Sequence, residues 1–225
     1  MPLHCTLVIF DCDGTLVDSL ASIARSANLA LIEAGFTEGI PQHAVAEVVG
    51  LSLEKAVATW LPEAGEAVQQ QVISAYKRHY LQLADAGELV TPLFPGVRTV
   101  LETLHNANVE MAIATGKSMR GLQRTLREHN LNTFFHSLQT ADVARSKPDP
   151  EMIENILRET GSNPKETLMV GDTTFDIEMG HQAGVITCAV TYGCHSRERL
   201  AQARPHHWLE RMADLPALLG LKIPP

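Results

Sequence analysis

Short apolar runs alternate with amphipathic segments over most of the chain beyond residue 90. Apolar and β-branched runs of this length are typical of buried strands, whereas apolar residues every three or four positions indicate helices. The predicted strands are residues 7–10, 109–115, 136–139, 167–170 and 185–190, and the predicted helices are 97–104, 118–128, 150–159 and 174–183. Strands alternating with helices predict a parallel sheet that helices cover on both faces.

The ends of two helices and the tail carry further indications. Asp149 is a plausible N-cap for the helix that begins with Pro150, and Gly184 is a plausible stop after residue 183. Residues 206–219 are expected to add an edge strand and a closing helix.

Residues 16–90 do not follow this alternation. Four segments have helical spacing and no convincing strand separates them: 19–34, 41–49, 52–60 and 66–86. Gly35, Gly50 and Leu61-Pro62 punctuate these segments. We therefore predict an α/β core formed by residues 1–15 and 91–225, with a helical cap, residues 16–90, inserted after the first strand.

Composition excludes several classes of protein. The chain has 225 residues, 45% apolar and 20% charged, and its net charge of -8 comes without a basic cluster, which argues against a nucleic-acid partner. The sequence has no apolar stretch near the roughly 20 residues that span a bilayer, so no membrane partner is expected. Its four cysteines form no CxxC pair, and the N-terminus lacks a basic region, which favours a reduced, cytoplasmic setting.

The first predicted strand ends in two carboxylates, Asp11 and Asp13, followed by Gly14, which permits a tight turn. Ligands of open parallel sheets bind beyond the carboxyl ends of the strands. Two carboxylates one residue apart repel each other unless a cation lies between them. This loop is therefore a candidate site for a metal ion and a phosphate.

Three other loops follow predicted strands. The first contains Thr115 and the helix start at Lys117-Ser118. The second contains Lys147 between Ser146 and Pro148, and the third contains the pair Asp172 and Asp176. A helix N-terminus can hold an anion. Mg²⁺ prefers oxygen ligands, and phosphoryl transfer requires the charge on the phosphoryl oxygens to be neutralised. Together the loops supply the groups for phosphoryl transfer.

These residues resemble the motifs of a known superfamily. Asp11-x-Asp13-Gly-Thr15, Thr115, Lys147-Pro148 and Gly171-Asp172-x-x-x-Asp176 are similar, in order and spacing, to the four motifs of the haloacid dehalogenase superfamily. The helical insertion resembles that superfamily's small α-helical cap, and the chain is most similar to its phosphoglycolate phosphatase-like members. The resemblance implies a Rossmann-like parallel sheet core and a hydrolase of phosphate monoesters.

The resemblance also implies catalytic roles. Asp11 would be the nucleophile that forms an aspartyl-phosphate, and Asp13 would protonate the leaving oxygen and then activate water. Thr115 would bind the phosphate, and Lys147 would neutralise charge on the nucleophile and the phosphoryl oxygens. The implied Mg²⁺ ligands are Asp11, the backbone carbonyl of Asp13, and Asp172, with Asp176 a ligand or a partner of one.

Three residues are candidates for substrate binding: Thr15, Gly116 and the cap residue Lys55. Many members of the superfamily have asparagine at the position of Gly116, so the chain departs from the pattern there. The ten histidines lack metal-ligand spacing and are expected at the surface or at edges. Cys12, between two carboxylates, is expected to stay a thiol.

The sequence leaves two other functions open. A phosphomutase would use the same groups but return the phosphoryl group to the rotated intermediate. A phosphate-sensing or partner-binding module would have no activity, against which the intact set of Asp11, Asp13, Lys147 and Asp172 argues. The expected substrate is a small phosphorylated metabolite, such as phosphoglycolate or a sugar phosphate, and the chain is expected to be a monomer or a homodimer.

Overall fold

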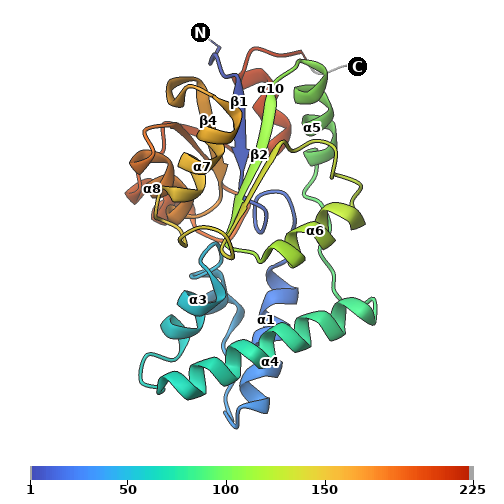
Figure 1. The fold of residues 1–225 in the computed structure, drawn as a ribbon, viewed down its shortest axis with the longest axis vertical. Helices are drawn as coiled ribbons and strands as arrows, with labels where there is room; N and C mark the ends of the chain where they lie inside the picture. Colours follow the sequence, from blue (N-terminus) through green and yellow to red (C-terminus); the bar gives the residue numbers. More distant parts are fainter. Residues whose placement is uncertain (1, 223–225) are drawn as a thin grey trace.

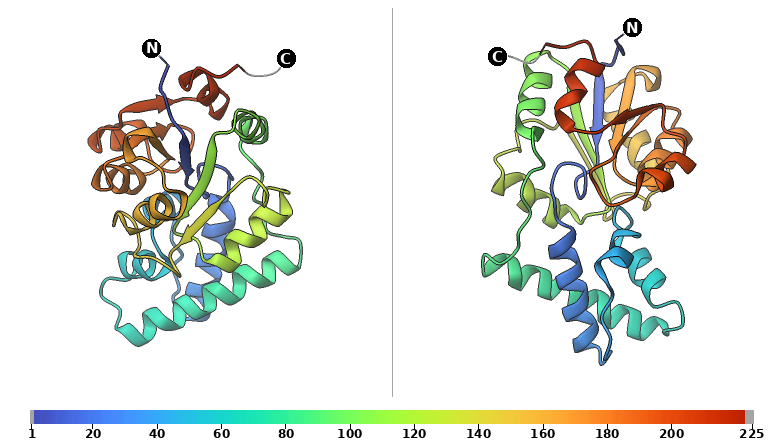
Figure 2. Two further views of the ribbon diagram at one scale, coloured as in Figure 1. Left: turned by 45° about the horizontal axis from the view of Figure 1, so that its top comes forward. Right: turned by 180° about the vertical axis from the view of Figure 1, so that it is seen from behind.

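The computed structural model describes residues 2–222, and a six-stranded parallel sheet organises the larger part of it. The strand order is β3-β2-β1-β4-β5-β6, so β1 lies at the centre of the sheet (Figures 1 and 2). The strands are β1 (Leu7–Phe10), β2 (Glu110–Thr115), β3 (Ser137–Thr140), β4 (Thr167–Gly171), β5 (Ile186–Val190) and β6 (His207–Leu209). The predicted α/β fold class is confirmed.

Alternate residues of β1 point to opposite faces of the sheet, as the two-residue repeat of a strand requires. Val8 and Phe10 belong to the larger apolar cluster, which includes residues of α5 (Val97–Asn106) and α6 (Met119–Glu128). Leu7 and Ile9 belong to a second cluster with residues of α7 (Glu151–Thr160) and α8 (Thr174–Gln182). Helices therefore cover both faces, and β1 is fully buried.

The other end of the molecule is helical, as predicted. The four helices of the insertion are α1 (Leu20–Glu33), α2 (Gln42–Ala46), α3 (Leu53–Trp60) and α4 (Glu66–Asp85). An apolar cluster of their own, which includes Leu31, Val57 and Ile73, holds α1, α3 and α4 together. These helices lie at the carboxyl ends of the strands, opposite the N-terminus and the last described residues (Figure 1).

The chain enters and leaves the cap at adjacent points. Val17 forms an isolated antiparallel bridge with Leu93, and the Asp18 N–H donates to the carbonyl of Pro92 at 2.8 Å. Leu16 and Val17 pack within the larger apolar cluster beside the sheet. This packing favours a point of entry into the cap after Val17. The predicted division between core and cap at residues 15/16 and 90/91 stays a prediction.

Local corrections concern helix ends and short elements. Pro150 rather than Asp149 is the N-cap of α7, although Asp149 accepts a hydrogen bond from the Glu151 N–H. The tail forms β6, a 3₁₀ turn at Met212–Asp214 and the short helix α10 (Leu215–Leu218). The helix α9 (Arg197–Gln202) and a 3₁₀ turn at Pro164–Glu166 were not predicted. Within residues 2–222 no helix combines the length and the apolar character needed to cross a membrane.

Candidate active site

The strand register brings three of the four predicted loops together. β1 pairs with β2 on one side and with β4 on the other, with Phe10 opposite Ile113 and Val170. Asp11 follows β1 directly, Thr115 ends β2, and Asp172 follows β4. Parallel pairing therefore places these side chains at one edge of the sheet.

A buried cluster of three carboxylates forms at this edge. Oxygens of Asp11, Asp172 and Asp176 lie within 4.8 Å of one another, and all three residues are fully buried. The Lys147 ammonium is also fully buried and lies 2.9 Å from Asp11 Oδ1 and 2.6 Å from Asp176 Oδ1. Lysine is rarely buried unless it is paired, so these two carboxylates account for its position.

The three carboxylates differ in how their oxygens are used. Asp176 accepts from Lys147 and, through Oδ2, from the N–H and hydroxyl of Thr173 in a capping box at the start of α8. Asp172 accepts from Cys194 N–H at one oxygen and from the hydroxyl of Thr15 at the other. Asp11 accepts no hydrogen bond at either buried oxygen.

This donor set fits a hard divalent cation. Asp11 offers both oxygens, and each Asp172 oxygen accepts only one hydrogen bond, which leaves acceptor capacity for a metal ion. Asp176 Oδ2 already accepts two hydrogen bonds. Asp176 is therefore better suited to holding Lys147 and the loop in place than to binding the ion.

Burial sets the protonation of this cluster. Burial raises the pKa of Asp11 to about 8, with the charges of Asp176 and Asp172 adding to the shift and Lys147 opposing it. Burial and the charge of Asp176 raise the pKa of Asp172 to about 7. Both carboxyls thus bind protons more tightly than a free aspartate, because their charged forms lack sufficient compensation.

Asp13 lies on the cap side of this edge. The sequence analysis did not predict the residues that contact its carboxylate. Its carboxylate accepts from the Lys117 ammonium at 2.6 and 2.8 Å and from the Ser19 hydroxyl at 2.5 Å. The side chains of Asp13 and Lys117 are 11% and 8% exposed, so the ion pair is largely protected from solvent. Although burial lowers the pKa of Lys117, the Asp13 charge raises it well above its ordinary value. The pair fixes the position of the Asp13 carboxylate.

The loop after β1 contacts Asp172 closely. Gly14 has a φ of +82°, and a Cβ at this position would lie 2.1 Å from Asp172 Oδ2, so only glycine fits. The neighbouring Thr15 donates its hydroxyl to Asp172 at 2.7 Å and is fully buried. This contact orients Asp172, and the predicted contact of Thr15 with substrate stays a prediction.

The cap is docked on the core through the segment around Gly50. The Ser52 N–H donates to the Ser146 hydroxyl at 2.9 Å, and Lys55 Nζ lies 3.3 Å from the carbonyl oxygens of both Ser146 and Lys147. Lys55 therefore binds the loop that carries Lys147. It is not among the residues that line the cavity described below, and its predicted role in substrate binding stays a prediction.

Gly116 explains how the cap approaches so closely. A Cβ added at Gly116 would lie 2.3 Å from the carbonyl oxygen of Leu51 and 2.5 Å from that of Gly50. Backbone of the cap thus lies where the asparagine side chain expected from the superfamily pattern would begin. Glycine at this position therefore permits the close approach of the cap, and its predicted contact with substrate stays a prediction.

A second contact between cap and core involves a histidine that the sequence analysis assigned to the surface. His195 is 1% exposed, and its Nδ1 accepts the Thr174 N–H at 3.0 Å, so Nε2 donates to the carbonyl of Glu47 in the cap. The Glu47 carboxylate pairs with Arg199 of α9. Burial lowers the pKa of His195 to about 4, which keeps the ring neutral. No spacing motif marks this histidine in the sequence.

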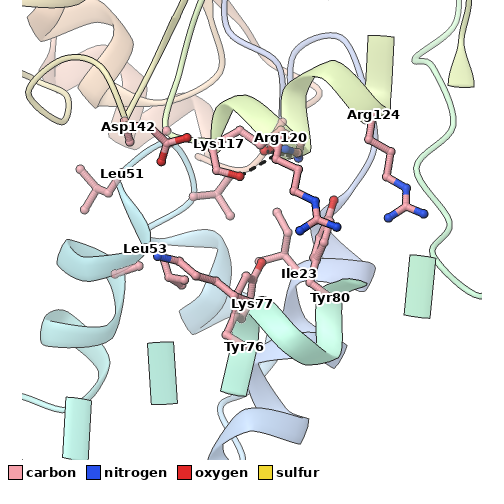
Figure 3. A pocket seen from close by; sticks show the side chains of 18 of the residues that line it. Ile23, Leu51, Leu53, Tyr76, Lys77, Tyr80, Lys117, Arg120, Arg124 and Asp142 are labelled. Atoms are coloured by element: carbon pink, nitrogen blue, oxygen red, sulfur yellow. Dashed lines mark hydrogen bonds and ion pairs between the residues drawn. The ribbon is translucent and has the colours of Figure 1, made fainter. Parts of the chain in front are cut away.

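A cavity of about 690 Å³ lies between the docked cap and the core (Figure 3). Asp13 and Lys117 line it on the core side, and Trp60, Tyr76 and Tyr80 line it on the cap side. A small molecule in this cavity would have Asp13 beside it.

The geometry agrees with comparisons to known proteins. The sequence model of the haloacid dehalogenase-like hydrolase family matches residues 8–190, which is most of the chain. The chain belongs to the haloacid dehalogenase-like hydrolase family. The resemblance drawn from the motifs is thereby confirmed.

Individual members of the family cover nearly the whole chain. "Probable phosphatase IndB" of Dickeya dadantii is 34% identical over 217 residues, which is 93% of this chain and 91% of that protein. Pyrophosphatase PpaX of Halalkalibacterium halodurans is 31% identical over 216 residues, 96% of this chain and 97% of that protein. The crystal structure of a predicted phosphoglycolate phosphatase from Haemophilus somnus superposes with a TM-score of 0.84 at 25% identity, covering 95% of this chain and 97% of that one.

A divalent cation should stabilise this family member more at high pH. The raised pKa values of Asp11 and Asp172 mean that, between about pH 4 and 8, the folded state without metal holds more protons than the unfolded state. Its stability therefore falls as the pH rises through this range. A cation at about 100 times its Kd adds about 2.7 kcal/mol, which is roughly 5–10 °C in Tm for a chain of this size.

Thermal unfolding with and without MgCl₂ at pH 5.5 and pH 8 measures this effect. We expect the full shift in Tm at pH 8 and a much smaller one at pH 5.5, where protons compete for the same oxygens. The Asp11→Asn, Asp172→Asn double variant should lose the shift at both pH values. An equal shift at the two pH values would contradict the assignment of the site.

Gly116→Ala should undock the cap segment. The added Cβ meets backbone oxygens that cannot rotate away, so the closed arrangement should lose about 1–3 kcal/mol. The Ser52 amide, which is bonded to Ser146, should then exchange with solvent about ten to a hundred times faster. Gly65→Ala is the matched control, because a Cβ there meets nothing within 4 Å. Unchanged exchange in Gly116→Ala would show that the segment is not held by this contact.

Proposed function

We propose that the protein is a Mg²⁺-dependent phosphatase that hydrolyses small phosphate monoesters through an aspartyl-phosphate on Asp11. One observation carries the proposal: Asp11 is fully buried at the end of β1, yet neither of its oxygens accepts a hydrogen bond. Its one cationic partner within residues 2–222, Lys147, lies at Oδ1 and is shared with Asp176. A buried carboxylate whose oxygens lack hydrogen bonds is costly, so a further, functional partner is expected. A phosphoryl group and a cation would satisfy it.

In the first step, an oxygen of Asp11 forms a bond to phosphorus while the bond from phosphorus to the ester oxygen breaks. Asp13, in protonated form, donates its proton to the departing oxygen. The Lys147 ammonium stays beside Asp11 and offsets the negative charge around the reacting group. A bound Mg²⁺, held by Asp11 and Asp172, would neutralise charge on the phosphoryl oxygens.

In the second step, water attacks the phosphorus of the aspartyl-phosphate. Asp13, now a carboxylate, takes a proton from the water, and the bond between Asp11 and phosphorus breaks. Inorganic phosphate leaves and Asp11 is restored. The contacts of Asp13 with Lys117 and Ser19 support this role, because they hold its carboxylate at the cavity wall. Thr115, which is 1% exposed at the end of β2, is proposed to bind the phosphoryl group.

The named relatives support a phosphorylated small molecule as the substrate. The closed cap leaves a cavity suited to a metabolite rather than to a phosphoprotein or a nucleic acid. We further propose a cytoplasmic setting and a monomer or homodimer. The four cysteines, all free thiols, are consistent with a reducing compartment. Burial raises the pKa of the Cys12 thiol, which argues against chemistry by that residue.

Asp11→Asn should reduce turnover at least about 1,000-fold, because the amide is a poor nucleophile and carries no charge for the cation. Release of inorganic phosphate from an aryl phosphate, measured with Mg²⁺, tests this. Asp214→Asn, a substitution of the same type in an exposed ion pair near the C-terminal helix, is the control. Appreciable activity in correctly folded Asp11→Asn would rule out the covalent mechanism, and isomerised ester without free phosphate would indicate a phosphomutase.

Asp13→Asn should affect esters according to their leaving group. Loss of the general acid should cost about 100- to 10,000-fold for an alkyl phosphate, whose leaving oxygen needs a proton, and much less for a nitrophenyl phosphate in the first step. Hydrolysis of the aspartyl-phosphate should also slow, so phosphoenzyme should accumulate. Rapid quench with a labelled aryl phosphate measures both effects. Equal losses for the two esters without trapped phosphoenzyme would exclude the acid–base role.

A further inference from the structure

The cavity beside Asp13 is larger than a two-carbon leaving group requires. Its volume of about 690 Å³ lies within the range of pockets that hold ligands of many atoms. Its walls come from α6 on the core side and from α3 and α4 on the cap side (Figure 3). A molecule that filled it would extend well beyond Asp13, which among the proposed catalytic residues is the one in its lining.

The acidic side chains that line this cavity all have partners. Asp13 pairs with Lys117, Glu54 with Lys77, and both Asp85 and Glu128 with Arg124. Asp142 accepts the Met119 N–H at the start of α6. Two lining cations, Arg120 and Arg127, have no side-chain hydrogen bond or ion pair with any residue of the described part of the chain. The lining holds five carboxylates and five cations, so it is neutral overall, but these two guanidinium groups are free to bind an anion.

Arg120 is the better placed of these two cations. It lies in the first turn of α6, four residues beyond Gly116, whereas Arg127 lies seven residues farther along the same helix, about 10 Å at the helical rise. Figure 3 shows the Arg120 side chain extending from α6 toward the cap helix α4. The Lys77 ammonium instead extends toward α3, where it pairs with Glu54.

Aromatic side chains form the wall opposite Arg120. Tyr76 and Tyr80 of α4 stack with ring centroids 5.9 Å apart, and Lys117 lies 5.7 Å from the centre of the Tyr80 ring. Such a wall offers apolar surface to a carbon skeleton or a ring. A guanidinium offers two parallel N–H donors to a carboxylate or phosphate.

We propose that the substrate is a phosphate monoester whose leaving group is longer than glycolate and carries a second anionic group, a carboxylate or a phosphate. Arg120 binds that second anion, and the carbon skeleton lies against Tyr76 and Tyr80. This inference rests on the proposed phosphatase function and narrows its substrate class. Arg120 is thereby a specificity-determining residue, in the place that the sequence analysis gave to Lys55.

Matched aryl esters test the proposal. Phenyl phosphate has an uncharged leaving group, and 4-(carboxymethyl)phenyl phosphate adds a carboxylate that a methylene separates from the ring, so the acidity of the leaving oxygen changes little. 4-(Phosphonomethyl)phenyl phosphate replaces the carboxylate by a second phosphorus anion and distinguishes the two anion types. We expect the wild-type kcat/KM to be higher for at least one of the two charged esters than for phenyl phosphate.

Arg120→Gln should lower kcat/KM for the preferred charged ester about ten- to a hundredfold, as expected for loss of a charged hydrogen bond, and change that for phenyl phosphate less than about twofold. Arg127→Gln is the matched control from the same helix and should leave the preference intact. Equal effects on the charged and uncharged esters, or a loss of preference in Arg127→Gln alone, would overturn the assignment.

Binding to Asp11→Asn, measured by calorimetry, separates this inference from the proposed function. The charged aryl ester should bind this variant more tightly than phenyl phosphate, and the added Arg120→Gln change should remove the difference. Phosphoglycolate should bind equally well with and without Arg120. Selective binding without turnover in the wild type would support the anion subsite and refute the phosphatase, whereas turnover without selective binding would refute the subsite alone.

Discussion

A single buried ammonium group, that of Lys147, faces more negative charge than it can offset. Three fully buried carboxylates meet at the end of the sheet, so a negative excess of two remains when all three are ionised. Water cannot screen this excess, and a low-dielectric interior makes it expensive. Protons would relieve it at low pH, and a bound divalent cation would relieve it at higher pH. The tight turn at Gly14, the capping box at Asp176 and the hydroxyl of Thr15 all serve to hold this unfavourable group of charges in one arrangement.

The cap covers this charged edge, so the core and the cap contribute different groups to the proposed substrate site. In the proposed reaction the core supplies the acids and Lys147, which would act on the phosphate of any ester. The cap supplies aromatic surface and encloses the cavity in which we propose that the leaving group lies. Lys117 belongs to both layers, since it holds Asp13 and also contacts the face of Tyr80 from the cap. A movement of α4 would therefore shift Lys117 and, through it, the Asp13 carboxylate.

The sequence was sufficient to predict the fold and the residues that follow the ends of the strands. Buried parallel strands are short, apolar and regularly spaced, so residues that follow them fall at one edge whatever the details of packing. Asp11, Thr115 and Asp172 were found in this way. Lys147 was also found in a loop after a predicted strand, but its role required the superfamily resemblance, because nothing local in the sequence distinguishes a buried lysine from an exposed one.

The remaining parts depend on contacts between distant segments. Lys117 was visible only as part of a helix start, and its pairing with Asp13, 104 positions away, follows from the relative position of two loops. His195 has no motif, and its buried ring contacts Thr174 of the core and Glu47 of the cap. Lys55 was a candidate for substrate binding because cap loops that face the core set specificity in related proteins, whereas its contacts with carbonyl oxygens of the core loop have no signal in the sequence. The observed end of a helix such as α7 differs from the predicted end by one residue, which is within the usual uncertainty of helix boundaries.

The close approach at Gly116 has a consequence for how this enzyme can change. The atoms that meet Gly116 are the carbonyl oxygens of Gly50 and Leu51, which every amino acid possesses. Substituting residue 51 alters a side chain and leaves the contacting oxygen in place. Only a change in the path or length of the cap loop would move these oxygens and make room for a larger residue at position 116. Loop length and residue 116 are therefore expected to vary together among descendants of this chain.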